Sequence, residues 1–363
     1  MIMRQMQWKR TRFLASNSSA TIFSFFKKKS IFITSLALFI CALAIRFMNF
    51  DTPTAFMVDE VYYAPAANAL LNFEADPNYV HPPLGKLIIA IGIEFFGYNS
   101  FGWRIAAVIA GSIMVPSLYL FGKKVFDNPT AIMASILLIF DPMVHVMSRI
   151  AMLDVFLALF VILAFLALAY NKYSISAIAL GLACGVKLSG AFAVIAIIAY
   201  LIYSKKINKI IKIITIAIGV FLLCLLPAII HDPSSFVGTF MFSFNWHLTL
   251  DSPHSSAALP FGWLINNVPF PIHSDAVEKI SAIANPFIYP IAIPVSIYLI
   301  YDCMRKKNCK SELLPVFWFV FVYGLFLILP RKTQFIFYLL PSIPAILLLF
   351  SYGILLILHE ISK

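Results

Sequence analysis

The stretch "IFITSLALFICALAIRFMN", residues 31–49, decides the class of this protein. It is predominantly apolar, contains a single charge, and is long enough to cross a bilayer as a helix, which takes about 20 residues. Nine further apolar runs of similar or somewhat shorter length follow, at 103–122, 130–146, 152–170, 174–187, 188–203, 212–230, 285–302, 313–330 and 333–357. The sequence therefore predicts an all-α integral membrane protein with about ten transmembrane helices.

The composition agrees with this class. Of the 363 residues, 61% are hydrophobic and only 12% are charged, about half the charged fraction of an ordinary soluble domain. The net charge of +11 does not indicate a nucleic-acid partner, because most of the basic residues fall in alternate loops, as the positive-inside rule describes. We therefore expect cytosolic termini, with a basic cytosolic segment at 1–30 preceding a membrane domain at 31–363.

Two connections between the predicted spans are long, and both are predicted on the extracytoplasmic side. They cover residues 50–102 and 231–284. The first contains "LGKLIIAIGIEFFG", residues 84–97, which is too short and too charged to span and is typical of an interfacial helix. Outward-facing chemistry is expected in these two loops.

The first outer loop carries two adjacent acids, Asp59 and Glu60, in "FMVDEVYYAPAANALL", residues 56–71. Asp59 can cap a short helix, but capping explains one acid and not two. A carboxylate at the edge of a membrane can also serve as a general base. We take Asp59 as the candidate base and Glu60 as its helper.

The motif "HPPLGK", residues 81–86, follows in the same loop. Proline at 82 holds His81 extended, and Pro83 is suited to start a helix. Lys86 then lies in the first helical turn, where a cation is unfavourable unless an anion binds at the same helix terminus. The motif predicts a phosphate site. Transfer from a lipid-phosphate sugar suits this chemistry, because the phosphate leaves without a general acid and cations stabilise it.

More charges lie at the outer ends of the predicted spans, where each costs at least about 2.5 kcal/mol in a membrane. Single residues of this kind can be snorkelling side chains or structural ion pairs, such as Arg149 with Asp154. As a set they predict a polar cavity that opens outward. The set comprises Arg46, Asp59, Glu60, Lys86, Glu94, Arg104, Asp141, Arg149, Asp154, Lys187 and Arg331.

Several blocks together resemble the dolichyl-phosphate-mannose–protein mannosyltransferases, which are membrane glycosyltransferases of the C-type fold. The blocks are "VDEVYYAPAANALL", "HPPLGK", "FGWRIAAVIAG", "SRIAMLDVFL", "GVKLSG", "RKTQFIFYLLPSIPA" and the loop "FNWHLTLDSPHSSAALPFGW". The resemblance implies transfer of mannose, with inversion, from a polyprenyl phosphate to a Ser or Thr hydroxyl of a protein. Tyr62, where the family often has His, is a departure. Another is the 231–284 loop, which is too short for the family's β-trefoil domain.

The resemblance also implies a set of site residues. Asp59 and Glu60 match the catalytic acids. His81, Lys86, Arg104 and Arg149 match positions expected to bind the donor phosphate. Supporting or substrate-contacting roles are expected for Tyr62, Asp154, Lys187, His247, His254 and Arg331.

Three function classes follow from these observations. The first is a protein mannosyltransferase, and the second is a C-type glycosyltransferase with a lipid or glycan acceptor. A transporter or flippase is disfavoured, because no internal repeat is visible and the charges gather at one side. A divalent metal at Asp59, Glu60, His247 and His254 is conceivable, but we predict that none is required. The five cysteines predict neither a zinc site nor a disulfide framework.

Overall fold

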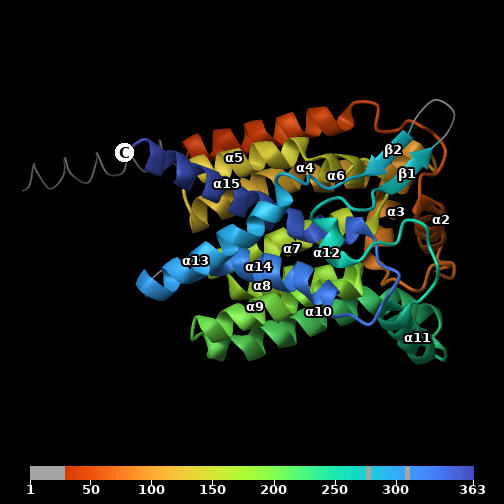
Figure 1. The fold of residues 1–363 in the computed structure, drawn as a ribbon. Helices are drawn as coiled ribbons and strands as arrows, with labels where there is room; N and C mark the ends of the chain where they lie inside the picture. The colour runs from red at the N-terminus through yellow and green to blue at the C-terminus, as the bar shows by residue number, and fades with distance from the viewer. Residues whose placement is uncertain (1–28, 275–278, 307–310) are drawn as a thin grey trace, which may run out of the picture.

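The computed structural model describes residues 29–274, 279–306 and 311–363. The predicted N-terminal segment 1–30 therefore lies almost wholly outside the described residues. The described chain forms a helical bundle, and segments 48–99, 232–274 and 279–284 gather at the end opposite the C-terminus (Figure 1). These segments make up most of the predicted outer loops, 50–102 and 231–284.

Each of the ten predicted apolar runs overlaps a helix, which confirms the all-α membrane architecture. In the part of the chain that the structure describes, four helices have the length and composition to cross a membrane: Lys29–Phe47, Ser100–Val125 (α4), Ile207–His231 (η2 and α10) and Ile336–Ile361 (η6 and α15). The other apolar runs form α5 (Asn128–Phe140), α7 (Leu153–Ala169), α8 (Tyr173–Val186), η1 with α9 (Leu188–Gly190, Ala191–Tyr203), α13 (Ala292–Lys306) and η4 with α14 and η5 (Ser311–Leu313, Leu314–Gly324, Leu325–Leu327).

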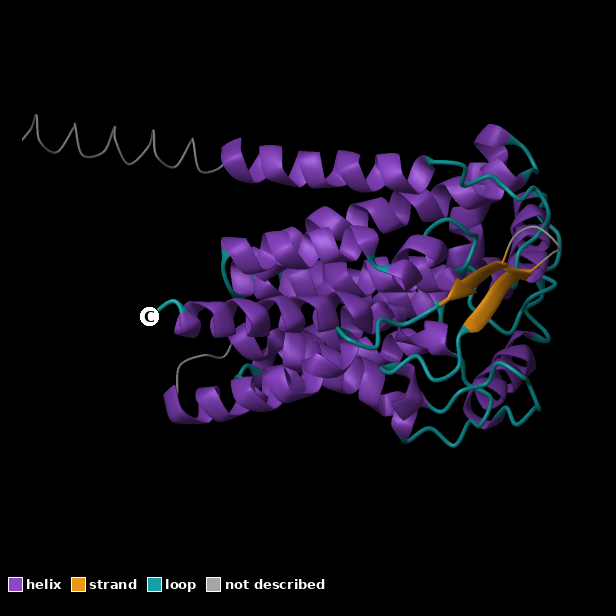
Figure 2. Ribbon diagram, turned by 45° about the horizontal axis from the view of Figure 1, so that its top comes forward, coloured by secondary structure: helices purple, strands orange, loops and turns teal. Residues whose placement is uncertain are grey.

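Short elements occupy the loop end of the bundle. In the first outer segment they are α2 (Glu60–Leu71) and α3 (Leu84–Phe96), the latter at the predicted interfacial helix. Further along lie α6 (Pro142–Met147), α11 (Phe236–Thr249), α12 (Pro260–Trp263) and η3 (Tyr289–Ile291). An antiparallel pair, β1 (Phe270–Ser274) and β2 (Lys279–Ala282), was not predicted; it lies among the loops in Figure 2, with Phe270 opposite Ala282.

Helix starts follow local sequence signals. The side chains of Asn99, Asp127 and Asp141 each accept a hydrogen bond from the backbone N–H three residues later, and so cap α4, α5 and α6. Pro83 lies directly before α3, as its fixed φ favours. Because these caps are local, the starts of α4, α5 and α6 are encoded in the adjacent sequence.

The core lies around α7, most of whose side chains are buried. Phe165 of α7 stacks on Trp318 of α14 with ring centroids 4.7 Å apart. Helix Lys29–Phe47 and α10 flank the bundle on opposite sides and leave apolar residues such as Phe32 and Leu223 exposed (Figure 1). Such continuous apolar surface is suited to lipid rather than to water.

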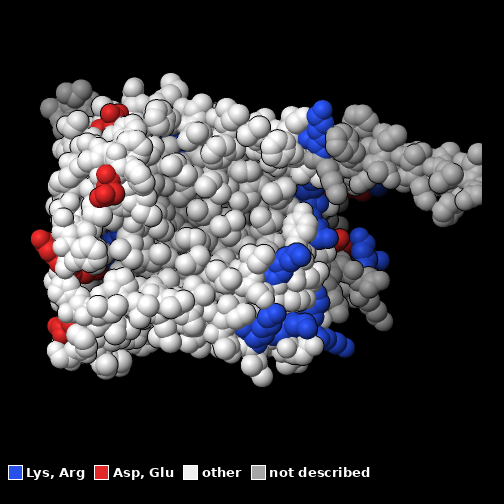
Figure 3. All heavy atoms as spheres, turned by 180° about the vertical axis from the view of Figure 1, so that it is seen from behind, with Lys and Arg blue, Asp and Glu red and all other residues white. Residues whose placement is uncertain are grey.

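Charged side chains separate to the two ends of the molecule. Figure 3 shows Lys and Arg at one end and Asp and Glu at the other. The basic end carries Lys124, Lys172 and Lys205, and the acidic end carries Glu74 and Glu94, all of them exposed. This separation is the structural counterpart of the predicted positive-inside pattern. Among the described cysteines, Cys303 is disulfide-bonded, whereas Cys41, Cys184 and Cys224 are free.

Candidate active site

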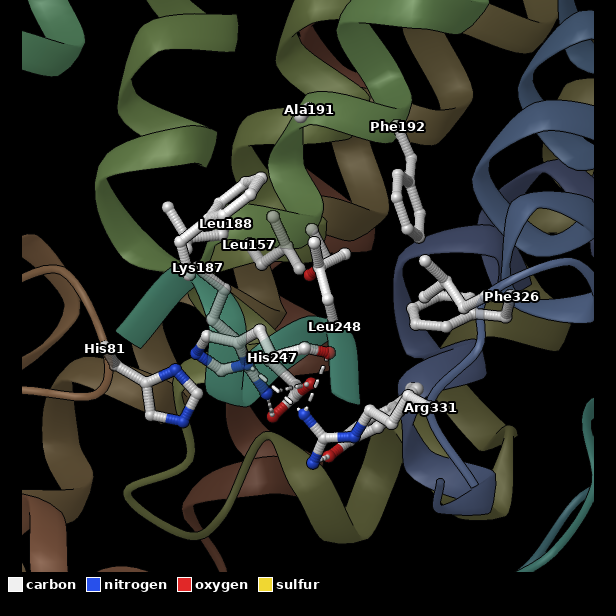
Figure 4. A pocket seen from close by; sticks show the side chains of 15 residues that line it. His81, Leu157, Lys187, Leu188, Ala191, Phe192, His247, Leu248, Phe326 and Arg331 are labelled. Atoms are coloured by element: carbon white, nitrogen blue, oxygen red, sulfur yellow. Dashed lines mark hydrogen bonds and ion pairs between the residues drawn. The ribbon is translucent and has the colours of Figure 1, made fainter. Parts of the chain in front are cut away.

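A cavity of about 150 Å³ opens at the acidic, loop-bearing end of the bundle. One part of its wall is polar, and the remainder is apolar (Figure 4). The polar groups are His81, Asp154, Lys187, Ser189, His247, Arg331 and Tyr338. The apolar groups include Leu157, Leu188, Phe192, Phe244, Leu248 and Phe326. A polar cavity is therefore present at the loop-bearing end, and its mixed wall suits an amphipathic ligand.

A buried ion pair forms one side of the cavity. Lys187 follows α8, and its Nζ lies 3.0 Å and 3.1 Å from the two carboxylate oxygens of Asp154, in the first turn of α7. The ammonium also lies 5.0 Å from the ring centroid of Tyr338. Asp154 is thus paired with Lys187, and the anticipated pair with Arg149 is not formed. Since an ammonium has three N–H donors, Lys187 can still donate to a ligand.

Arg331 supplies a second cationic group to the cavity wall, in addition to Lys187. Its Nε donates to the backbone oxygen of Thr333 at 2.7 Å, and one terminal nitrogen donates to the Tyr338 hydroxyl at 3.1 Å. The other terminal nitrogen lies 3.3 Å from Nδ1 of His247, and the guanidinium lies 4.8 Å from the Trp246 ring centroid. These contacts fix the guanidinium plane, which favours directional binding of an anion over simple charge attraction.

Two neutral histidines lie beside these cations. His247 has its Nε2 2.7 Å from the Val80 oxygen, so this nitrogen carries the proton and Nδ1 accepts from Arg331. Burial lowers the pKa of His247 to about 4 and lowers that of His81 well below its usual value. The two rings lie 4.8 Å apart between centroids. Nδ1 of His81 is buried and has no partner among the described residues, which leaves it available to a ligand.

Asp59 lies next to the Lys187–Asp154 pair. It occupies the N-cap position of α2, but its side chain does not cap the helix, so the capping alternative is wrong. The Tyr63 hydroxyl donates to its Oδ2 at 3.4 Å. Burial raises the pKa of Asp59, and the positive charge of Lys187 opposes this rise. A carboxylate with a raised pKa and only one long hydrogen bond is suited to accept a proton.

Glu60 has a different environment, although it is adjacent in sequence. Its side chain is fully buried, and each oxygen accepts two hydrogen bonds. Arg104 donates to both oxygens at 2.8 Å and 2.7 Å, and the backbone N–H groups of Met57 and Ala151 donate at 2.9 Å and 2.8 Å. Glu60 has no accepting position left for a substrate proton. This geometry favours a structural role over the expected catalytic one.

Arg104 and Lys86, expected to bind the donor phosphate, are also committed to protein groups. The five N–H donors of Arg104 reach Glu60 and the backbone oxygens of Phe50, Pro53 and Ala55. The ammonium of Lys86 is buried and donates to the Asp76 carboxylate and to the oxygens of Asn78 and His81. Neither retains a donor for phosphate. Both instead hold the outer loop in place.

Five of the twelve expected site residues line the cavity: His81, Asp154, Lys187, His247 and Arg331. The other seven, which include Asp59, Glu60, Lys86 and Arg104, do not, and the last three of the seven are Arg149, Tyr62 and His254. Arg149 contacts His145 and the oxygen of Met48. Tyr62 is 58% exposed on α2. His254 is exposed and accepts from the N–H of Ser256, but it is close enough to Asp59 to influence its pKa. The roles expected for these residues stay predictions.

Two site residues were not selected from the sequence. Tyr63 donates to Asp59, and four-residue spacing on a helix would have indicated this contact. Tyr338 contacts both cationic groups of the cavity. The sequence feature that could have indicated Tyr338 as a site residue was its position in the "RKTQFIFYLLPSIPA" block.

The fold defines the class of protein. The chain superposes on ArnT from Cupriavidus metallidurans with a TM-score of 0.65 and 16% identity, over 88% of this chain and 59% of that one. The Archaeoglobus fulgidus oligosaccharyltransferase matches with a TM-score of 0.59 and 14% identity, over 91% of this chain and 51% of the other. The protein has the fold of the C-type membrane glycosyltransferases.

Sequence comparison adds a match to one family over part of the chain. Residues 80–231 match the family described as dolichyl-phosphate-mannose-protein mannosyltransferase. Polyprenol-phosphate-mannose–protein mannosyltransferases from Mycolicibacterium smegmatis and Mycobacterium tuberculosis are each 38% identical to this chain, over 137 and 141 residues. These matches cover 35% and 36% of this chain but only 27% of each relative's length. The resemblance to this family is thereby confirmed over the matched region.

Proposed function

We propose that this protein transfers mannose from a polyprenyl phosphate to Ser or Thr hydroxyls of proteins, with inversion at the anomeric carbon. The reaction takes place on the extracytoplasmic face of the membrane. The observation that carries this proposal is the position of Asp59: a carboxylate with one long hydrogen bond beside a cationic cavity with an apolar extension.

The known relatives support the lipid donor and the sugar. Relatives that match about a third of this chain are named for transfer from polyprenol-phosphate-mannose to protein. The ArnT protein, which shares the fold, has been solved bound to undecaprenyl phosphate. A cavity with both cationic and apolar walls fits a phosphate joined to a polyprenyl chain.

In the proposed reaction Asp59 accepts the proton of the attacking hydroxyl. The acceptor oxygen forms a bond to the anomeric carbon while the bond from that carbon to the phosphate oxygen breaks. The polyprenyl phosphate leaves as an anion, so no acid has to protonate it. The raised pKa of Asp59 strengthens it as a base.

Arg331 and Lys187 stabilise the departing phosphate. Arg331 is held by Thr333, Tyr338 and His247, and Lys187 by Asp154. Positions fixed before the reaction lower the cost of stabilising charge that develops in the transition state. The two histidines remain neutral at physiological pH and are suited to hydrogen-bond sugar hydroxyls rather than to neutralise phosphate.

The test is a transfer assay with labelled polyprenyl-phosphate-mannose and a Ser/Thr peptide in detergent or nanodiscs. The proposal expects labelled peptide from the wild-type protein and none above background from Asp59→Asn. Turnover by a correctly folded Asp59→Asn protein would remove Asp59 as the base. We also propose that no metal is required, so activity should persist after treatment with a chelator and desalting.

A second candidate uses the same donor chemistry with a lipid or glycan acceptor. The fold likeness to ArnT favours it. So does a 34% identical match over 88 residues to an undecaprenyl phosphate-aminoarabinose arabinosyl transferase of Pseudomonas savastanoi. Mass spectrometry of secreted proteins from a deletion strain separates the two candidates. Loss of O-linked mannose supports the protein acceptor, whereas unchanged proteins with an altered lipid or glycan support the alternative.

A further inference from the structure

The surface helix α11 has an apolar face that no described segment covers. Val237, Met241 and Phe244 lie at i, i+4 and i+7 on this helix, and 68%, 57% and 46% of their respective surfaces are exposed. This spacing puts all three on one face. Residues 236–249 contain no Lys, Arg, Asp or Glu. A helix with such a face is suited to the boundary between lipid headgroups and acyl chains.

This apolar face is continuous with the surface of a predicted membrane span. Helix α10 ends at His231, five residues before α11 begins, and it exposes Leu222 and Ile230. Phe240 of α11 lies 6.3 Å from Phe221 of α10 between ring centroids. Lipid that contacts α10 therefore also reaches α11, at the end of the bundle where the cavity opens (Figure 1).

The C-terminal part of α11 borders the cavity. Phe244, His247 and Leu248 line it. The helix is joined to the first outer loop through one backbone oxygen: Val80 accepts from the Ser243 hydroxyl at 2.6 Å and from His247 Nε2 at 2.7 Å. The next residue along is His81, whose backbone oxygen is held by Lys86. The position of α11 thus determines the position of the cavity wall.

We propose that α11 is the membrane-contacting wall of the cavity. Its Val237–Met241–Phe244 face binds the acyl chains of the leaflet at the cavity end, and this contact holds the cavity mouth at the depth of a membrane-borne donor. The inference deepens the proposed function and rests on it for the choice of donor. The occupant of the apolar face is the bilayer itself.

The first experiment needs no enzymatic activity. A fluorescent amino acid replaces Met241, and the protein is placed in nanodiscs whose phospholipids carry brominated acyl chains. We expect strong quenching at position 241 and little at a control position, Ser255, in the exposed loop after α11. Equal, weak quenching at both positions would overturn the proposal, whether or not the protein transfers mannose.

The second experiment separates membrane contact from chemistry. For Met241→Asp we expect the KM for a long-chain polyprenyl donor to rise at least tenfold, with kcat little changed and with the KM for a short-chain, water-soluble donor unaltered. Phe73→Asp is the matched control, because Phe73 is 93% exposed at the same end but does not line the cavity. A parallel KM rise for both donors, or the same rise in the control, would overturn the proposal. If the wild-type protein transfers from neither donor, the proposed function fails, while the quenching result still decides the role of α11.

Discussion

Replacing Glu60 by Ala tests whether the two adjacent acids have separate roles. The substitution removes the acceptor of four hydrogen bonds and leaves the guanidinium of Arg104 buried without its counter-charge. Breaking a buried ion pair from one side costs about 3–5 kcal/mol. We therefore expect Glu60→Ala to lower the free energy of unfolding by about this amount. Asp59→Asn should leave stability nearly unchanged, because Asp59 has no ion pair and one long hydrogen bond among the described contacts.

The assay pairs thermal unfolding in detergent with mannose transfer at a temperature where both variants are folded. Asp59→Asn should lower kcat by about a hundredfold or more, the usual contribution of a general base. A double variant, Glu60→Gln with Arg104→Met, replaces the buried charges by neutral groups of similar size. It should recover part of the stability that Glu60→Ala loses, because no unpaired charge then remains.

Two results would refute this division of roles. One is a Glu60→Ala protein with wild-type stability and a kcat as low as that of Asp59→Asn, which would make Glu60 catalytic. The other is an Asp59→Asn protein that unfolds as readily as Glu60→Ala, which would make the loss of transfer in Asp59→Asn a consequence of unfolding.

Three more predictions concern pH, stability and donor binding. kcat/KM should fall as the pH decreases through the raised pKa of Asp59, because a protonated carboxyl cannot accept a proton; a pH–rate profile without this acid limb would contradict the assignment. Asp141→Ala should lower the free energy of unfolding by about 1–3 kcal/mol, because the side chain caps α6 at Val144 and accepts from the Tyr289 hydroxyl at 2.7 Å. An unchanged melting temperature in detergent would contradict this prediction. Arg331→Lys should raise the KM for the donor by about tenfold or more, because a lysine cannot reproduce the fixed guanidinium contacts; an unchanged KM would place the phosphate elsewhere.

The membrane fold was predictable because its signal is local. A run of apolar residues such as 31–49 reveals a span without knowledge of its neighbours. Helix caps such as Asn99 and Asp127 are equally local. The β1–β2 pair, in which Phe270 lies opposite Ala282, was not predictable in this way, because the sequence between the two strands carries no strong hairpin signal.

The sequence predicted part of the cavity wall but not the pairings of its charges. It indicated that cations and acids gather in one place, and Asp154, Lys187 and Arg331 do line one cavity. It could not show that the ammonium of Lys86 donates to oxygens of its own loop, or that the guanidinium of Arg104 pairs with Glu60. The contacts of Arg104 join residues up to 54 positions apart, which no spacing rule reports.

The adjacency of Asp59 and Glu60 has a geometric reason. Successive residues at a helix start point about 100° apart, so the side chain of Glu60 can enter the protein while that of its neighbour Asp59 points elsewhere. Glu60 Oε1 accepts a hydrogen bond from the N–H of Ala151, three residues before Asp154. The same carboxylate therefore ties the segment that carries Asp59 to the segment that carries Asp154, whose partner is Lys187. The proposed base and the neighbouring ion pair come from distant parts of the chain, and Glu60 fixes their relative positions. In the proposed mechanism, the buried carboxylate of Glu60 thus positions the carboxylate that accepts the proton.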